Sequence, residues 1–222
     1  MAEAARIALL AGATGLVGSH CLSQLLRDPT YGRVVVVVRR PLPLTDPRLD
    51  ARVVDFERLA ESELPRVDDV YCALGTTIRR AGSRAAFRRV DHDYVVALAR
   101  RAAERGAARF VLVSSIGADA RSPVFYSRVK GETERDVTAV GFQAVHLLRP
   151  SLLVGERSER RPGERLMIGL SSGIAPLLVG PFRRYRPIAA EVVARAMRAV
   201  ALRDARGTYV HESDRIAELG TA

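Results

Sequence analysis

The chain has 222 residues, enough for one well-buried core, and its 48% hydrophobic and 27% charged residues are typical of a soluble globular domain. The N-terminus shows no basic and apolar leader, and no apolar run reaches the roughly 18 residues of a membrane helix. Neither the two distant cysteines, Cys21 and Cys72, nor the four histidines show metal-ligand or disulfide spacing. We therefore expect a cytoplasmic protein with free thiols and no bound metal.

The net charge is +10, and almost all of the positive charge is arginine: among 35 Lys+Arg residues, only Lys130 is a lysine. The arginines are scattered, with short clusters in "RRAGSRAAFRR" (79–89) and "RRYR" (183–186) but no interleaved aromatic residues. We interpret this charge as a solvated surface and do not expect nucleic acid as a partner. A polyanion-binding face is the alternative interpretation.

Apolar runs alternate with helix-like segments through most of the chain. Six runs, several of them β-branched, predict strands of a buried parallel sheet at 6–12, 33–40, 51–57, 68–77, 108–118 and 143–155. Apolar residues at helical spacing predict helices over 14–29, 83–106, 124–141 and 189–204, and the end of the chain fits a short strand plus a helical turn. This alternation predicts an α/β fold with a Rossmann-type doubly wound parallel sheet.

The pattern changes after Gly155, where the sequence becomes rich in Gly, Pro and Arg as far as residue 188. We expect residues 1–155 to form the dinucleotide-binding core and residues 156–222 a small C-terminal substrate lobe over the carboxyl edge of the sheet, within a single domain. The apolar stretch 166–181 fits a substrate lid, a dimer patch or a membrane-touching surface, and the sequence does not choose among them. The chain is expected to be a monomer or a homodimer.

"AGATGLVGSH" joins the first predicted strand to the first predicted helix and places Gly12, Gly15 and Gly18 three residues apart. Gly12 permits a tight turn, Gly15 lets the backbone approach a pyrophosphate, and Gly18 lets the helix pack close to the sheet. The phosphates then lie on the free N–H groups at the positive end of the helix, with a hydroxyl from Thr14. The alternative is a loop that merely needs glycine. The expected binding residues here are Gly12, Thr14, Gly15, Leu16, Val17 and Gly18.

Arg39 and Arg40 end the second strand, where NAD-binding sheets carry an acid for the ribose 2′-OH and an arginine accommodates a 2′-phosphate instead. We therefore predict NADP(H) in preference to NAD, against the alternative that the arginines only cap an exposed strand end. Asp55 and Phe56 end the third strand, where the carboxylate suits the adenine amino group, or alternatively caps the next turn. The flexible end of the fourth strand, with Leu74, Gly75 and Thr76, is expected to pass under the cofactor or to be a simple turn.

Tyr126 and Lys130 are four residues apart and project from one face of a predicted helix. Ser114 and Ser115 end the preceding strand. Reducing a carbonyl requires a proton on oxygen, and a free tyrosine with a pKa of about 10 is poorly matched to neutral pH. A nearby cation favours the phenolate, and the compact head of lysine suits this role better than the planar fork of arginine. A serine hydroxyl would hold the substrate oxygen. The alternative for Tyr126 and Lys130 alone is a surface pair.

"GATGLVG", "VVDF", "LVSSIGAD" and "YSRVK" resemble the atypical or extended branch of the short-chain dehydrogenase/reductase superfamily over residues 5 to 155. "RPSLLVGERSERRPGE" resembles a narrower group, the small NADPH-binding Tat-interacting-protein-like oxidoreductases. The resemblance implies Tyr126 as acid/base, Lys130 on the nicotinamide ribose and Ser115 as the substrate-orienting serine, with Ser114 as its rival. It also implies that Pro150 and Ser151 lie near the nicotinamide. Many extended members are longer, so sugar-nucleotide substrates are not inferred.

The leading hypothesis is an NADP(H)-dependent oxidoreductase acting on a small carbonyl or alcohol whose identity the sequence does not reveal. The second is an NADPH-binding regulatory or scaffold protein with little or no turnover, which the short lobe favours. The intact Tyr126 and Lys130 pair favours the enzyme.

Overall fold

A seven-stranded parallel sheet organises the chain in the computed structural model, which describes residues 5–61, 64–155 and 180–221. The spatial order is β3-β2-β1-β4-β5-β6-β9, and every neighbouring pair is parallel. The strands of this sheet are β1 (Arg6–Ala11), β2 (Tyr31–Val38), β3 (Leu49–Val53), β4 (Asp69–Cys72), β5 (Arg109–Val113), β6 (Ala144–Arg149) and β9 (Gly207–Glu212). A separate parallel pair joins β7 (Leu153–Val154) to β8 (Ile188–Ala189).

The order of the strands reverses beside β1. From β1 the chain winds outward through β2 and β3 on one side, and from β4 through β5 and β6 on the other. In a doubly wound sheet, ligands bind in the crevice outside the carboxyl ends of the strands at this reversal. The predicted Rossmann-type doubly wound fold is confirmed.

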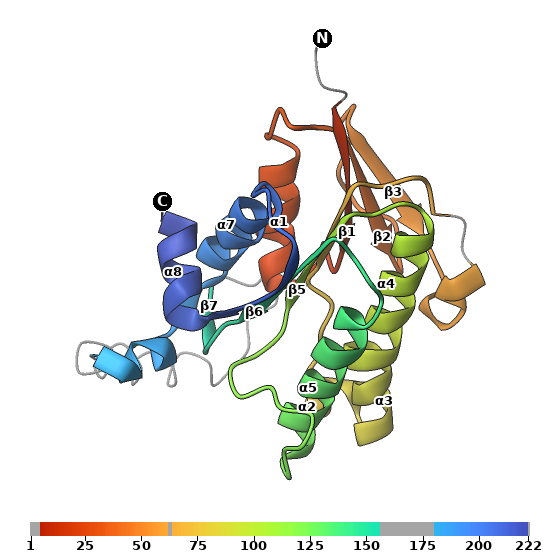
Figure 1. Ribbon diagram of the computed structural model, residues 1–222. Coiled ribbons are helices and arrows are strands. Elements are labelled where there is room, and N and C mark those ends of the chain that lie inside the picture. The colour runs from red at the N-terminus through yellow and green to blue at the C-terminus, as the bar shows by residue number, and fades with distance from the viewer. Residues whose placement is uncertain (1–4, 62–63, 156–179, 222) are drawn as a thin grey trace.

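Helices cover both faces of the sheet (Figure 1). One face carries α1 (Leu16–Leu25), α7 (Ala190–Ala201) and α8 (Ser213–Thr221). The other carries α3 (Arg84–Arg88), α4 (Tyr94–Glu104) and α5 (Phe125–Thr138). Short turns complete the described chain: η1 (Phe56–Glu61), α2 (Ile78–Ala81), η2 (Arg89–Asp93) and η4 (Gly180–Tyr185). None of the helices in these described ranges is long and apolar enough to cross a membrane.

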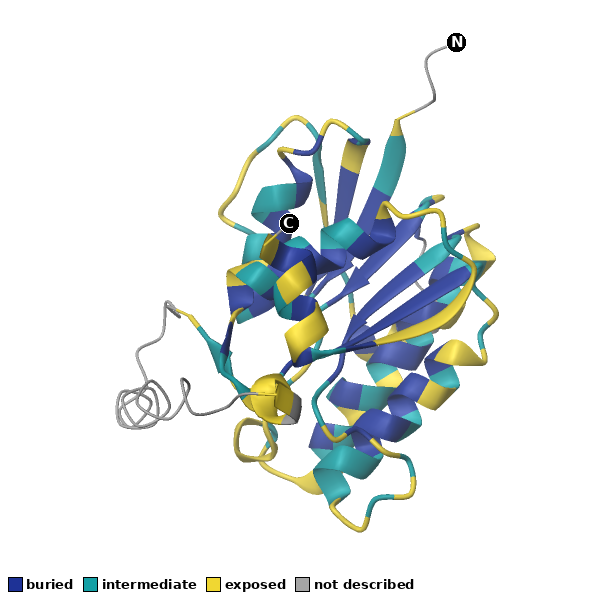
Figure 2. Ribbon diagram, turned by 60° about the vertical axis from the view of Figure 1, so that its left-hand side comes forward, coloured by how far each residue is buried: buried dark blue, intermediate teal, exposed yellow. Residues whose placement is uncertain are grey.

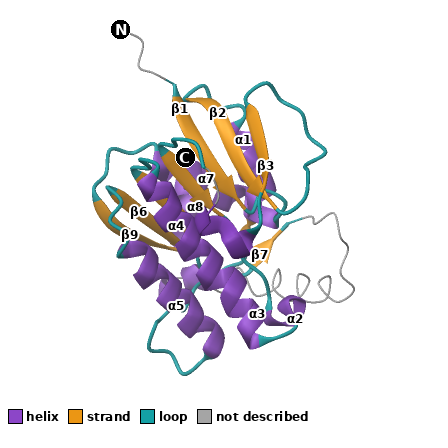
Figure 3. Ribbon diagram, turned by 90° about the vertical axis from the view of Figure 1, so that its right-hand side faces the viewer, coloured by secondary structure: helices purple, strands orange, loops and turns teal. Residues whose placement is uncertain are grey.

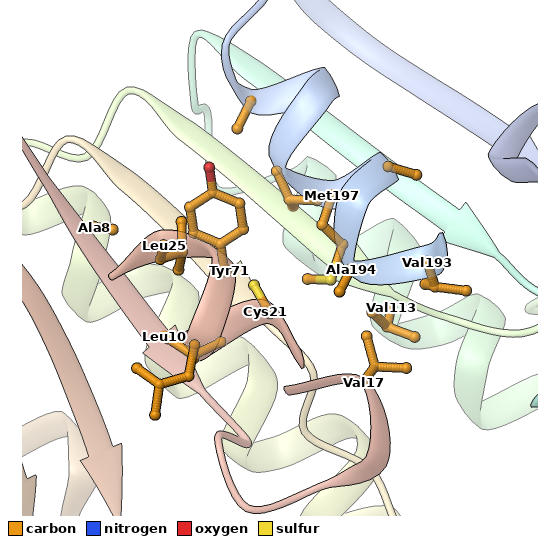
Figure 4. Close-up of a cluster of buried hydrophobic side chains, with 14 of the residues drawn as sticks. Ala8, Leu10, Val17, Cys21, Leu25, Tyr71, Val113, Val193, Ala194 and Met197 are labelled. Atoms are coloured by element: carbon orange, nitrogen blue, oxygen red, sulfur yellow. The ribbon is translucent and has the colours of Figure 1, made fainter. Parts of the chain in front are cut away.

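Two buried clusters, one on each face of the sheet, hold the layers together. Figure 2 shows the inner strands as mostly buried, whereas the edge strands β3 and β9 carry exposed and intermediate residues. The valine run of β2 divides between the clusters: Val36 faces one and Val35 the other. This explains why its sequence is apolar without alternation. On the α1 and α7 side, Leu10, Tyr71 and Met197 come together (Figure 4).

The predicted helix over 83–106 is interrupted by a π turn. After α3 the chain continues without leaving helical geometry through η2, a π-helical turn at Arg89–Asp93, and then into α4. Such single turns widen the helix by one residue and occur frequently at functional sites. Here the turn lies against α5, and it buries Asp91, which is 1% exposed.

The C-terminal part of the chain completes the sheet as well as lying at its edge. We expected residues 156–222 to form a small lobe, yet β9 extends the main sheet beside β6 (Figure 3), and α7 and α8 pack on its face. The terminal helical turn is a full helix, α8. Near the carboxyl edge, a Cβ on Gly155 would lie 2.9 Å from the Leu16 side chain, so the chain after β7 lies against the start of α1. The apolar stretch 166–181 falls almost wholly outside the described residues.

Candidate functional site

The glycine turn after β1 brings three backbone segments into close contact. Gly12 has a φ of +89°, and a Cβ there would lie 2.4 Å from the carbonyl oxygen of Ala73, just beyond β4. A Cβ on Gly18 would lie 2.0 Å from the carbonyl oxygen of Gly12. Any side chain at either position would therefore push α1 away from the ends of β1 and β4.

The N-terminus of α1 is suited to an anion. Gly15 is its exposed N-cap residue, none of the described side chains caps it, and its first turn contains no acid. The backbone N–H of Gly15 donates to the Gly12 carbonyl at 2.9 Å, which closes the turn. Thr14 is exposed beside it, while Leu16 and Val17 begin the helix. The unpaired N–H groups of a helix start, with the positive end of its dipole, form a natural site for a phosphate.

A second part of the site is a pocket of about 430 Å³ beyond the ends of β2 and β3. Arg39 and the pair Asp55 and Phe56 all lie in its wall, whereas Arg40 is exposed and is not part of the lining. The full lining is Arg39, Val53, Val54, Asp55, Phe56 and Tyr94. The carboxylate of Asp55 also accepts from the backbone N–H of Glu57 at 2.9 Å. Asp55 therefore caps the turn that follows it, as the alternative interpretation held, while still lining the pocket.

Tyr94 is a pocket residue that the sequence did not single out. Its ring packs on Phe56 with the ring centroids 5.5 Å apart, and its hydroxyl donates to the Glu57 carboxylate at 2.6 Å. Burial, and then the Glu57 carboxylate, raise the pKa of Tyr94 to about 12. The phenol therefore stays neutral, and the two rings, tilted by 41° against each other, give the pocket an aromatic wall beside which a base can lie.

Lys130 is buried on α5, with its Nζ 2.7 Å from Oδ1 of Asp91. Burial alone would lower the pKa of Lys130, but the Asp91 carboxylate and then the Tyr126 phenol outweigh it, so that the pKa is raised. Lys130 therefore carries an ammonium group whose pKa depends on both Asp91 and Tyr126. Tyr126 itself is half-buried, with its ring centroid 5.4 Å from that of Phe87.

Asp91 was missed by the sequence analysis, and it connects the lysine to the loop after β4. Its second oxygen, Oδ2, accepts from the backbone N–H of Thr76 at 2.8 Å. A Cβ on Gly75 would lie 3.3 Å from Asp91 Oδ1 and 3.7 Å from Lys130 Nζ, so Gly75 passes directly beside the ion pair. The sequence did contain a signal for Asp91. It is an acid that lies four residues after Phe87 and four before Val95, on what would be an apolar face of a regular helix.

The two serines follow β5 with different surroundings. The Ser114 side chain is buried, and its hydroxyl has no hydrogen-bond partner among the described residues. Ser115 is half-buried, and its hydroxyl donates only to the neighbouring Ile116 carbonyl, at 3.4 Å. Of the two, Ser115 is the more exposed, whereas the Ser114 hydroxyl is closed off from solvent, and the choice between them stays open.

The segment after these serines holds α5 in place. A Cβ on Gly131 would lie 2.1 Å from the backbone nitrogen of Ala120, and the N–H of Asp119 donates to the Ser127 carbonyl at 3.1 Å. Buried Pro150 joins the same edge, because its carbonyl accepts from the Ile116 N–H at 3.0 Å. The ends of β5 and β6 and the start of α5 therefore form one continuous rim.

Together these residues fit a dinucleotide. The glycine turn leaves room where side chains would collide, the helix start offers N–H groups, and the pocket beyond β2 and β3 supplies a cation and aromatic rings. No group of three His, Cys, Asp or Glu side chains that could hold a metal ion occurs within the described ranges.

Comparison with known proteins agrees with this geometry. Residues 12–153 match the family described as NAD(P)H-binding. Protein fmp52, mitochondrial, from Aspergillus niger is 39% identical over 184 residues, which cover 79% of this chain and 78% of that protein. Protein HTATIP2 from Rattus norvegicus is 39% identical over 160 residues, covering 70% and 66%. The solved structure of MoeE5 in complex with UDP-glucuronic acid and NAD has a TM-score of 0.69 at 22% identity, covers 92% of this chain and 75% of its own, and shares the fold.

These relatives correct one expectation. We expected a cytoplasmic protein from the absence of a leader, and this was wrong, because the fungal relatives are named as mitochondrial proteins. A targeting signal is read by receptors and does not have to leave a mark in the folded core, which is the part of the chain that the motifs describe.

The glycine turn, the uncapped start of α1 and the match over residues 12–153 lead to one conclusion: the chain belongs to the NAD(P)H-binding family, with the Rossmann-type fold of the short-chain dehydrogenase/reductase-like proteins.

Proposed function

We propose that this protein is an NADP(H)-dependent oxidoreductase that transfers a hydride to or from a small carbonyl or alcohol. The observation that carries the proposal is the environment of Lys130. A chain that uses arginine for its other 34 positive charges places its one lysine in a buried position, charged, beside Tyr126 and the loop after β4. Burying an ammonium is costly, so a purely structural role would be filled more cheaply by an apolar residue.

In this proposal three side chains of the site each have a defined task. Tyr126 exchanges a proton with the substrate oxygen, and Lys130 holds the ribose hydroxyls while remaining close to the phenol. Ser115, or its neighbour Ser114, donates a hydrogen bond to the same oxygen. The nicotinamide, when bound, supplies the hydride chemistry.

The choice of NADP(H) over NAD rests on Arg39. It lines the pocket next to Asp55 and Phe56, and Arg40 stands beside it at the exposed end of β2. A guanidinium at this position matches a 2′-phosphate with charge and with paired N–H donors.

For the domains we propose that residues 1–155 hold the dinucleotide and that the chain from 156 onward supplies the substrate side, while β9 and α7 complete the core. A Cβ on Gly155 would lie 3.6 Å from the Cβ of Ala190, and the Ser151 N–H donates to the Ser213 hydroxyl at 3.1 Å. Both contacts support this division, because they join the C-terminal part to the carboxyl edge of the sheet.

The test is NADPH oxidation against a panel of small carbonyl compounds, comparing the wild type with Tyr126→Phe. We expect a loss of turnover of about 10² to 10⁴-fold, the usual contribution of a general acid, with NADPH affinity almost unchanged. Tyr209→Phe is the matched control: its hydroxyl donates to the Arg206 carbonyl on the far edge of the sheet, and its activity should equal that of the wild type. Tight NADPH binding without any Tyr126-dependent turnover would contradict the proposed enzymatic activity and favour an NADPH-binding regulatory protein.

A further inference from the structure

The ion pair between Asp91 and Lys130 is almost entirely out of water. The side chains of Lys130 and Asp91 are 8% and 1% exposed, and their charged atoms are 2.7 Å apart. Solvent therefore screens the two charges weakly, and each has a strong effect on its immediate neighbours. The Tyr126 phenol is their ionisable neighbour, because Tyr126 precedes Lys130 by four residues on α5 and lies on the same helix face.

The position of the Asp91 carboxylate is fixed on several sides. Oδ2 accepts from the Thr76 N–H at 2.8 Å, and the backbone carbonyl of Asp91 accepts from the Thr133 hydroxyl at 2.9 Å. One residue further, Nε2 of His92 lies 2.9 Å from the Asp136 carboxylate, on the same helix as Lys130. The π turn thus presents its acid to α5 through a series of contacts, and the carboxylate remains beside Lys130 rather than turning to solvent.

We propose, on the basis of the function proposed above, that Asp91 is a positioning residue that balances the Lys130 ammonium, so that the ammonium draws the Tyr126 phenol less strongly toward the phenolate and the site favours carbonyl reduction. An unpaired ammonium in a buried site would favour the phenolate, which is the form that accepts a proton from an alcohol. A carboxylate at 2.7 Å cancels much of that field, and the neutral phenol is the form that donates a proton to a carbonyl.

The charges around Lys130 agree with this assignment. The groups that face it are Asp91 from η2, Tyr126 from α5 and Cys72 from β4. Burial raises the pKa of Cys72 to about 12, so its thiol is neutral. The ammonium and the carboxylate then cancel, and the cluster carries no net charge as long as the phenol keeps its proton.

The reductive step balances as follows. The carbonyl carbon receives a hydride, with its two electrons, from the reduced nicotinamide, and the carbonyl oxygen receives the proton of the Tyr126 hydroxyl. The C=O π bond is replaced by one C–H and one O–H bond, the cofactor is oxidised, and the phenolate regains a proton from water. Asp91 exchanges no atom in this step.

The sole lysine gives a measurement that does not need turnover. Protein labelled with ¹³C at the lysine ε carbon should show one lysine resonance, whose chemical shift follows the protonation of Lys130 with pH. We expect Asp91→Asn to move that titration to lower pH by about one unit or more. Asp136→Asn removes a carboxylate charge from the same helix, at the residue that contacts His92, and as the matched control it should leave the titration in place. An unchanged titration in Asp91→Asn overturns the proposal.

A second measurement uses the wild-type residue at position 91, in case Asp91→Asn does not fold. The ultraviolet difference absorbance between the wild type and Tyr126→Phe isolates the Tyr126 phenol from the other five tyrosines. We expect no phenolate signal at neutral pH, and a clear one would overturn the proposal. Where turnover is found, the alkaline limb of the pH profile for reduction should lie about one pH unit lower in Asp91→Asn. Failure to find turnover would count against the proposed function, whereas the two spectroscopic results would still decide the role of Asp91.

Discussion

Each end of the sheet buries an acid beside at least one cation, but the neighbouring tyrosines are fully buried at the amino end, whereas Tyr126 at the carboxyl end is only half-buried. At the amino end, Asp69 is 0% exposed and forms ion pairs with Arg6 and Arg109. The Tyr31 hydroxyl donates to Asp69 at 2.8 Å and lies 2.6 Å from the Tyr71 hydroxyl. Burial raises the pKa of both tyrosines, so both phenols remain neutral hydrogen-bonding groups.

At the carboxyl end, Asp91 and Lys130 are equally buried, but Tyr126 beside them is half-exposed and the Ser114 hydroxyl has no partner among the described residues. The comparison shows that the same kinds of side chain serve two purposes. A closed polar cluster contributes to the stability and uniqueness of the fold, whereas an open one can exchange protons and hydrogen bonds with a ligand.

The largest effect that separates the two ends is expected for Asp69→Ala. Removing this acid leaves two arginines and a tyrosine hydroxyl without their buried partner, which should lower the free energy of unfolding by about 3 to 5 kcal/mol, measured by urea denaturation. Asp50→Ala is the matched control, since Asp50 pairs with Arg33 and Arg52 near the surface and should cost no more than about 1 kcal/mol. NADPH affinity of the folded fraction should not change in either variant. A specific loss of affinity in Asp69→Ala would contradict the division between the ends.

A second closed cluster should show itself through pH. His146 on β6 and His211 on β9 are buried, with Nδ1 of His146 3.1 Å from Nε2 of His211. Burial first, and then the neighbouring positive charges, lower the pKa of each histidine from 6.5 to about 4. Between these values the unfolded chain binds protons that the folded one does not, so stability falls as the pH drops from about 6.5 to about 4.

We expect that loss to be on the order of 3 kcal/mol for each histidine, measured by urea denaturation across this range. Replacing both residues, His146→Leu with His211→Leu, should flatten the dependence in this window. The fall below about pH 4 should persist, because Asp136, whose pKa is lowered to about 2 chiefly by its hydrogen bond with Arg135, loses its stabilising charge there. If the free energy of unfolding of the wild type does not change between pH 6.5 and 4, protonation of the histidine pair does not destabilise the folded state.

The smallest expected effect is at the open end and concerns cofactor choice. Arg39→Asp should weaken NADP(H) binding relative to NAD(H) by about tenfold or more, because a charge-assisted hydrogen bond to phosphate is lost, as measured by fluorescence titration of both cofactors. Arg40→Asp changes the same net charge one residue away from the pocket lining and should have a smaller effect. Equal losses in the two variants would mean that long-range charge, rather than a contact, selects the cofactor.

Local patterns predicted the elements that build the site. The β-branched run of β2, the glycine spacing before α1 and the four-residue separation of Tyr126 and Lys130 each depend on neighbours in the chain. Asp91 did not follow from such a pattern, because its role arises from a π turn that the periodicity of a regular helix does not show. The position of β9 was missed for a related reason. Its edge position leaves residues 207–210 exposed, so its pattern gives no sign of its partner.

By itself, the sequence determined the class of fold, the glycine turn before α1 and the placement of Tyr126 and Lys130 on one helix, because strand burial, glycine conformation and helix periodicity are properties of short segments. Only the tertiary structure decided which acid faces Lys130, which arginine lines the pocket, and that the end of the chain joins the sheet. These facts depend on contacts between residues far apart in the chain, such as Asp91 with Lys130 and β6 with β9, and such contacts exist only once the layers have packed.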